Sequence, residues 1–165
     1  MDSYTFASEI VVPTVKEALA DRRNRRRTYV AAIVTYSLAE YVAKDAGIDR
    51  TDVYAALRGV CELAFEVVQG ICNGTKHAGN SRGFRFVPGQ DRHVPVFAWG
   101  VSSAGWGQGR WGVSGLSVER NGEELFLDTC IQVVLLSFCR IYKDQLGKLD
   151  LSFLDQMLLQ GQSTD

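Results

Sequence analysis

The sequence predicts a mainly α-helical fold, a bundle of four or five helices with a small antiparallel β-hairpin or three-stranded sheet inserted at about 82–126, before the last long helix. Apolar residues recur at helical spacing on both sides of this insertion. Inside it the spacing becomes strand-like, and glycine and tryptophan are frequent. The 165 residues suit one domain, which we place at 1–160 with a flexible tail at 161–165.

The first two helices are joined by an arginine-rich segment. The first is predicted at about 3–20, with Ser3 as its N-cap. Pro13 is expected to kink this helix or split it in two, because proline donates no backbone hydrogen bond. The second begins within the arginines and spans about 22–46, where apolar residues again recur at helical spacing. Gly47 then suits the left-handed position that commonly follows a helix.

The third helix is predicted from about 49–51 to beyond Ile71, and its pattern divides it into two faces. One face is a continuous apolar stripe. The opposite face carries Glu66, Asn73 and His77 towards its C-terminal end. A carboxylate, an amide and an imidazole on one helix face are the residue types of a proton-transfer site, so these three are the candidate catalytic residues.

Strand-like segments follow the third helix. Short strands are predicted at 84–87 and 94–99, and a hairpin is predicted at 116–126. The Asn121-Gly122 pair indicates the hairpin turn, because these residue types accept the two positive φ angles of a type I′ turn.

The last long helix is predicted from Asp128, as its N-cap, to about Gly147. It is apolar around nearly its whole circumference, which is typical of a helix in the middle of a bundle. The predicted core is shared by the second, third and last long helices and includes Val30, Val34, Leu38, Leu57, Val60, Ala64, Val68, Ile131, Val134, Leu135 and Phe138.

Composition limits the classes of function. The formal net charge of −1 gives no long-range attraction to nucleic acids or acidic membranes. The N-terminus lacks the pattern of a signal peptide and the most apolar run is too short to cross a bilayer, so we expect a cytoplasmic protein. The four cysteines are expected to be buried free thiols. No Cys or His spacing predicts a metal site, and no cofactor is predicted.

Two interpretations of the segment 73–77 stay open. Lys76 and His77 favour the negative end of a helix dipole, so the segment can be a simple helix terminus. Alternatively, Asn73 and His77 share a face with Glu66 upstream, and form a polar site with the histidine as general base.

Besides Lys76 in this segment, two further groups are candidates for binding. The arginines of the 22–27 cluster, Arg25 and Arg26 among them, either hold a phosphate backbone or pair with nearby acids at a helix start. Trp106 and Trp111, with Arg110, either stack on a ligand or partner, or cap the end of the bundle as a small core.

The run 66–77, which ends in the pattern Asn-x-x-Lys-His, resembles a group of uncharacterised bacterial helical-bundle proteins. In that group a helix with this ending is followed by a β-hairpin segment and then by an apolar helix. The segments 6–14 and 36–41 resemble the same group, with Ser37 and Glu40 where a histidine and an aspartate are expected. The resemblance spans most of the chain and implies a fold but no activity.

More remotely, the layout resembles HEPN-type bundles, some of which cut RNA. Their signature places an arginine four to six residues before a histidine, often with a polar residue next to the arginine. Here Asn73 matches the polar residue and His77 the histidine, whereas Cys72 stands in place of the arginine. The chain therefore lacks the cation that would steady a phosphate.

These observations lead to two hypotheses. The first is a non-enzymatic cytoplasmic interaction module, a homo-oligomer that recognises a protein partner through the tryptophan-rich insertion and the 73–77 segment. The second is a HEPN-like RNA- or nucleotide-handling protein, with His77 as the acid–base group, Asn73 positioning it and the arginines holding phosphate. The first predicts His77 packed beneath the hairpin, and the second predicts it exposed in a basic cleft.

Overall fold

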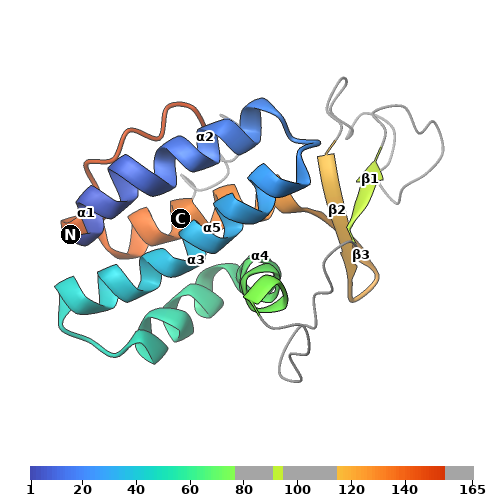
Figure 1. The fold of residues 1–165 in the computed structure, drawn as a ribbon. Coiled ribbons are helices and arrows are strands. Elements are labelled where there is room, and N and C mark those ends of the chain that lie inside the picture. Colours follow the sequence, from blue (N-terminus) through green and yellow to red (C-terminus); the bar gives the residue numbers. More distant parts are fainter. Residues whose placement is uncertain (77–90, 95–114, 155–165) are drawn as a thin grey trace.

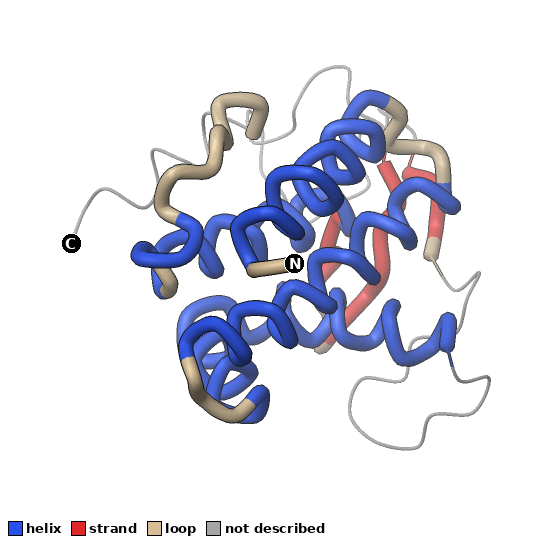
Figure 2. The backbone as a smooth tube through the Cα atoms, turned by 60° about the vertical axis from the view of Figure 1, so that its left-hand side comes forward, coloured by secondary structure: helices blue, strands red, loops and turns tan. Residues whose placement is uncertain are grey.

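The computed structural model describes residues 1–76, 91–94 and 115–154, and these form a mainly helical bundle with a small antiparallel sheet (Figure 1). This is the predicted fold class. The sheet stands at one end of the bundle and precedes the last long helix (Figures 1 and 2). The strand predicted at 84–87, and nearly all of the one predicted at 94–99, lie outside the described residues.

The first predicted helix consists of three consecutive helical parts. α1 (Ser3–Phe6) passes into a π-helical turn, η1 (Ala7–Val11), and then into α2 (Val12–Ala20). The disturbance expected at Pro13 is this π turn, which ends just before the proline. Proline has no backbone N–H to donate. The wider π turn before it tolerates this missing hydrogen bond, so the chain continues as a helix.

α3 (Arg25–Ala46) is the second predicted helix. Asn24 caps its N-terminus by accepting a hydrogen bond of 3.2 Å from the backbone N–H of Arg27. Gly47 follows its C-terminus with a φ of 66°, which confirms the predicted left-handed position.

Two aspartates fix the start of α1. Asp2, and not Ser3 as predicted, is the N-cap, and its carboxylate accepts a hydrogen bond of 2.7 Å from the backbone N–H of Thr5. The backbone N–H of Ser3 donates instead to the carboxylate of Asp45, near the end of α3, and Ser3 is buried. Aspartate and serine are equally good N-caps, so the contact with α3 decides between them.

α4 (Arg50–Lys76) is bent, whereas the prediction treated it as one straight rod. Cys61 has non-helical backbone angles, φ −143° and ψ 51°, and the second half of the helix is viewed nearly along its axis in Figure 1. Side chains from both halves meet across the bend. The Arg58 guanidinium donates to the Gln69 side chain at 3.0 Å and lies 5.5 Å from the ring centroid of Phe65. A single helical phase therefore does not hold along α4.

Two members of the predicted core are exposed. Val60, just before the bend, is 48% exposed, and Val30 on the outer side of α3 is 40% exposed. Val34 and Ala64 are only partly buried and pack against the core. The other predicted members are buried: Leu38, Leu57, Val68, Ile131, Val134, Leu135 and Phe138.

The predicted hairpin is confirmed. It consists of β2 (Gly115–Arg120) and β3 (Glu123–Phe126), which pair antiparallel. Asn121 and Gly122 join them with φ angles of 53° and 81°, the two positive values that a type I′ turn needs.

β1 (Arg92–Val94) pairs antiparallel with the other edge of β2, so the order of the described strands is β1-β2-β3. His93 lies opposite Leu116 in this pairing. The strand predicted to start at Val94 therefore begins two residues earlier, because Arg92 and His93 also pair with β2.

α5 (Leu127–Ile141) follows β3 directly and is buried on most sides, as expected for the middle of the bundle. Phe126 occupies its N-cap position, and Asp128 lies in the first turn instead. The helix ends earlier than predicted, because the backbone of Tyr142 is non-helical, and a short α6 (Lys143–Leu146) follows.

Candidate functional site

Two of the candidate residues, Arg25 and Glu66, each form an ion pair where the sheet joins the helical bundle. Three ion pairs cross between different elements there. We call this region the sheet corner, and define it by the described residues Arg22, Arg25, Tyr29, Glu66, Asp91, Arg120 and Asp128.

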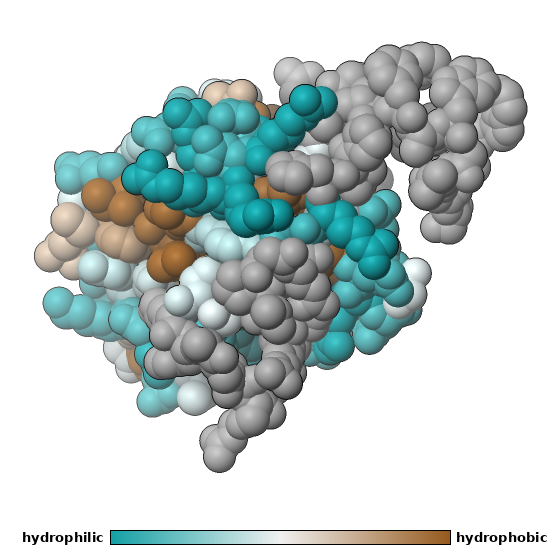
Figure 3. All heavy atoms as spheres, turned by 45° about the vertical axis from the view of Figure 1, so that its right-hand side comes forward, coloured by the Kyte–Doolittle hydropathy of each residue, from teal (hydrophilic) through white to brown (hydrophobic). Residues whose placement is uncertain are grey.

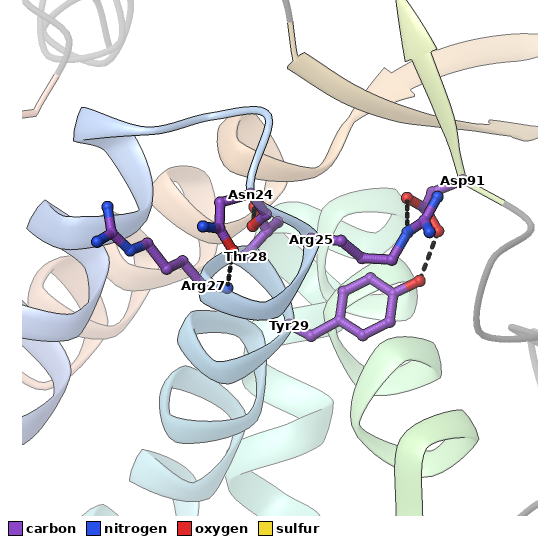
Figure 4. A network of polar contacts seen from close by, with 6 residues as sticks. All are labelled: Asn24, Arg25, Arg27, Thr28, Tyr29 and Asp91. Atoms are coloured by element: carbon purple, nitrogen blue, oxygen red, sulfur yellow. Dashed lines mark hydrogen bonds and ion pairs between the residues drawn. The ribbon is translucent and has the colours of Figure 1, made fainter.

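Asp91 immediately precedes β1, and two side chains from the first turns of α3 hold its carboxylate (Figure 4). The Nε of Arg25 donates to Oδ2 at 2.8 Å, and the Tyr29 hydroxyl donates to Oδ1. The Asp91 side chain is 0% exposed and that of Arg25 is 44% exposed. We call these three residues the Asp91 latch. Arg25, a candidate phosphate ligand in the sequence, therefore attaches the sheet to α3.

The latch keeps its carboxylate ionised. Burial alone would raise the pKa of Asp91, but the hydrogen bonds from Tyr29 and Arg25 and the charge of Arg25 stabilise the ionised form more, so the pKa lies below its ordinary value. The hydrogen bond to Asp91, followed by its charge, raises the pKa of Arg25. A carboxylate stabilised in this way is a poor proton acceptor at neutral pH.

Glu66 is held by the far end of β2. Arg120 donates to the same carboxylate oxygen of Glu66 through Nη2 at 2.8 Å and through Nε at 3.2 Å. Both side chains are partly exposed, 29% for Arg120 and 25% for Glu66. Glu66 was predicted to support His77, but in the structure it joins α4 to the hairpin.

The arginine cluster also pairs with acids. Nη1 of Arg22 lies 3.0 Å from Oδ2 of Asp128, whose side chain is 6% exposed. Nη1 of Arg27 lies 3.6 Å from the carboxylate of Asp21. Arg26 is exposed on α3. For three of the cluster's arginines, the interpretation that they pair with nearby acids is therefore confirmed.

The 73–77 segment is only partly described. Asn73 and Lys76 lie in the last turns of α4, and Asn73 is partly buried. His77 lies outside the described residues, as do the other candidate binding residues Trp106, Arg110 and Trp111. The described part of the predicted catalytic group consists of Asn73 and Glu66, and the carboxylate of Glu66 is bonded to Arg120.

No motif or periodic pattern in the sequence points to Tyr29, Asp91 or Arg120. The only local signal was the density of arginines before α3. It predicts that acidic residues lie nearby in space, but it does not identify them. Asp91 lies 66 positions from Arg25, and Arg120 lies 54 positions from Glu66. Pairs this distant leave no periodic pattern in the sequence.

The described part of the chain holds no candidate metal site, and two of its cysteines are unreactive. No group of three or more His, Cys, Asp or Glu side chains there could hold a metal ion. None of the four cysteines forms a disulfide. Burial raises the pKa of both Cys130 and Cys139 to about 12, so these thiols stay protonated and unreactive at neutral pH.

No protein-family model, curated protein or solved structure matches this chain. The resemblances to uncharacterised bacterial bundles and to HEPN proteins therefore stay predictions. Across residues 1–76, 91–94 and 115–154, no helix is both long and apolar enough to cross a membrane.

Proposed function

We propose that this protein is a non-enzymatic cytoplasmic interaction module. The helical bundle is its scaffold, and the sheet corner, with the tryptophan-rich insertion between α4 and α5, is its recognition surface for a protein partner. The Asp91 latch is the observation that carries this proposal, because its buried carboxylate fixes one strand of the insertion to α3.

The described acids of the sheet corner serve the fold. A catalytic acid or base exchanges a proton with its substrate. The carboxylate of Asp91 already accepts from Arg25 and Tyr29, and that of Glu66 already accepts from Arg120. These contacts support a structural role for the two carboxylates. In an enzyme, a catalytic carboxylate would have to be available to the substrate.

The sheet is attached on two sides. The Asp91 latch joins β1 to α3, and the pair between Glu66 and Arg120 joins β2 to α4. A pre-organised surface loses less conformational freedom when it binds a partner. The sequence between α4 and β2 contains all three tryptophans, and tryptophan supplies large contact areas in protein interfaces. The absence of disulfides among the four cysteines fits a reducing compartment such as the cytoplasm.

The proposal is tested by photo-crosslinking in cells. A photoreactive amino acid is placed at Arg92, which is exposed on β1, and separately at Ile48, which is 40% exposed in the turn at the opposite end of the bundle (Figure 1). We expect a discrete covalent adduct from position 92 and none from position 48. Adducts of equal yield from both positions, or none from position 92, would overturn the assignment of the recognition surface.

A second assay tests the absence of catalysis. Wild-type protein and the His77→Ala variant are incubated with a panel of RNAs and nucleotides, and we expect neither to produce cleavage. Cleavage by the wild type that is lost in His77→Ala would replace the proposal with the RNA- or nucleotide-handling alternative. The described cations do not favour that alternative, because Arg22, Arg25 and Arg27 pair with acids of the same chain.

A further inference from the structure

The outer face of α3 carries apolar residues between opposite charges. Val30 is 40% exposed and Ile33 is partly buried, while Arg26 and Glu40 are exposed. Together with Ser37 they follow one another at intervals of three and four residues, so they form one stripe along the helix. We call these five residues the α3 stripe.

Contacts on both flanks of α3 leave this stripe facing outward. On one flank the ring of Tyr41 stacks on Phe6, with the centroids 4.0 Å apart. On the other flank the ring of Tyr36 stacks on Tyr54 of α4, with the centroids 5.2 Å apart. Apolar surface next to hydrophilic surface is visible on the bundle in the space-filling view (Figure 3). An exposed apolar patch with a charged border is typical of a protein interface.

The stripe is complementary to itself. Arg26 precedes Ile33 by as many residues as Glu40 follows it. When two copies of α3 cross antiparallel at Ile33, each Arg26 therefore meets the Glu40 of the other copy, and Val30 is covered near the centre. A two-fold interface requires this reciprocity, in which one residue contacts a second and the second contacts the first.

We infer that the α3 stripe is the self-association surface of an antiparallel homodimer with its two-fold axis at Ile33. The five residues of the stripe are different from those of the sheet corner, although Arg26 and Val30 directly follow Arg25 and Tyr29 on α3. The inference concerns self-association, so it does not depend on the proposed function. Glu40 already pairs with Arg50 at 2.7 Å, but the two side chains are 59% and 53% exposed. The carboxylate of Glu40 therefore remains open to a second arginine.

Two matched valine substitutions test the apolar centre. The full-length wild type, Val30→Glu and Val60→Glu are compared by sedimentation velocity over a concentration series. Val60 is 48% exposed and lies in α4, off the stripe, so it controls for adding a carboxylate to an exposed valine. We expect a wild-type dimer, a dissociation constant at least about tenfold higher for Val30→Glu, and no change for Val60→Glu, because only the first buries an unpaired charge.

Charge reversal tests the orientation. Arg26→Glu and Glu40→Arg should each weaken the dimer, because each sets like charges against one another, and the double variant should restore it. A wild type that stays monomeric at every concentration overturns the inference and leaves the stripe to a different protein. Equal effects of Val30→Glu and Val60→Glu also overturn it. A double variant no stronger than the single ones rejects the antiparallel arrangement about Ile33.

Discussion

The two attachments of the sheet use the same chemistry in different surroundings. At β1 the carboxylate of Asp91 is fully buried and accepts from both Arg25 and Tyr29. At β2 the carboxylate of Glu66 remains 25% exposed and accepts two hydrogen bonds from Arg120. Water therefore competes for the carboxylate of Glu66 but not for that of Asp91. The stability that an acid–arginine pair contributes should therefore follow the burial of the acid rather than the number of bonds.

The largest effect is expected at the Asp91 latch. Asp91→Ala should lower the free energy of unfolding by about 2–3 kcal/mol, because Tyr29 loses a buried acceptor and Arg25 loses its counter-charge. Urea denaturation at neutral pH measures this loss. Asp91→Asn is the matched control: it keeps the size and one acceptor oxygen, and should lose less. A loss of under about 0.5 kcal/mol for Asp91→Ala would show that burial does not strengthen the latch.

Tyr29→Phe removes one hydroxyl from the latch and should cost about 1 kcal/mol at neutral pH. The cost should depend on pH. The folded-state pKa of Asp91 lies below its ordinary value of 3.8, so the latch contributes fully above that value and its contribution is lost as the pH falls through the folded-state pKa. Without the hydroxyl the folded-state pKa of Asp91 rises towards the ordinary value.

The difference in unfolding free energy between wild type and Tyr29→Phe should therefore shrink when urea denaturation is repeated below about pH 4. A difference that stays the same from neutral pH down to pH values below the folded-state pKa would mean that the hydroxyl does not stabilise the ionised carboxylate.

The contrast also explains what the sequence could predict. Gly47 ends α3 and Asn121-Gly122 turns the hairpin as expected, because their positive φ angles are a local requirement that the residue type itself meets. The same holds for the mainly helical class, which follows from apolar spacing. Local chemistry was therefore sufficient for the order of the elements and for most of the buried core.

Tertiary contacts decide the features that the sequence did not predict. No proline in the sequence indicates the bend at Cys61, and Arg58 contacts Gln69 across this bend. Val60 was wrongly assigned to the core because the predicted apolar stripe was continued through that bend. Arg25 and Glu66 were candidates for binding and catalysis because they are charged. Their partners, Asp91 and Arg120, are distant in sequence, so the sequence did not reveal that their role is structural.

The smallest effects are expected where the acids are most exposed. Glu66→Gln should cost about 0.5–1 kcal/mol, and Glu40→Gln, which breaks the pair with Arg50, should cost less than about 0.5 kcal/mol. Both are measured by urea denaturation in the Val30→Glu background, so that any association through the α3 stripe does not add to stability. The order Asp91, Glu66, Glu40 follows the exposed fractions of the three carboxylates, 0%, 25% and 59%.

Added salt separates burial from bond geometry as the cause of this order. Raising the salt concentration should reduce the effect of Glu40→Gln by the largest fraction and that of Asp91→Ala by the smallest, because screening reaches exposed charges first. If Glu66→Gln costs as much as Asp91→Ala at every salt concentration, burial does not set the order. The two bonds that Arg120 donates to one oxygen of Glu66 would then account for the strength of that attachment.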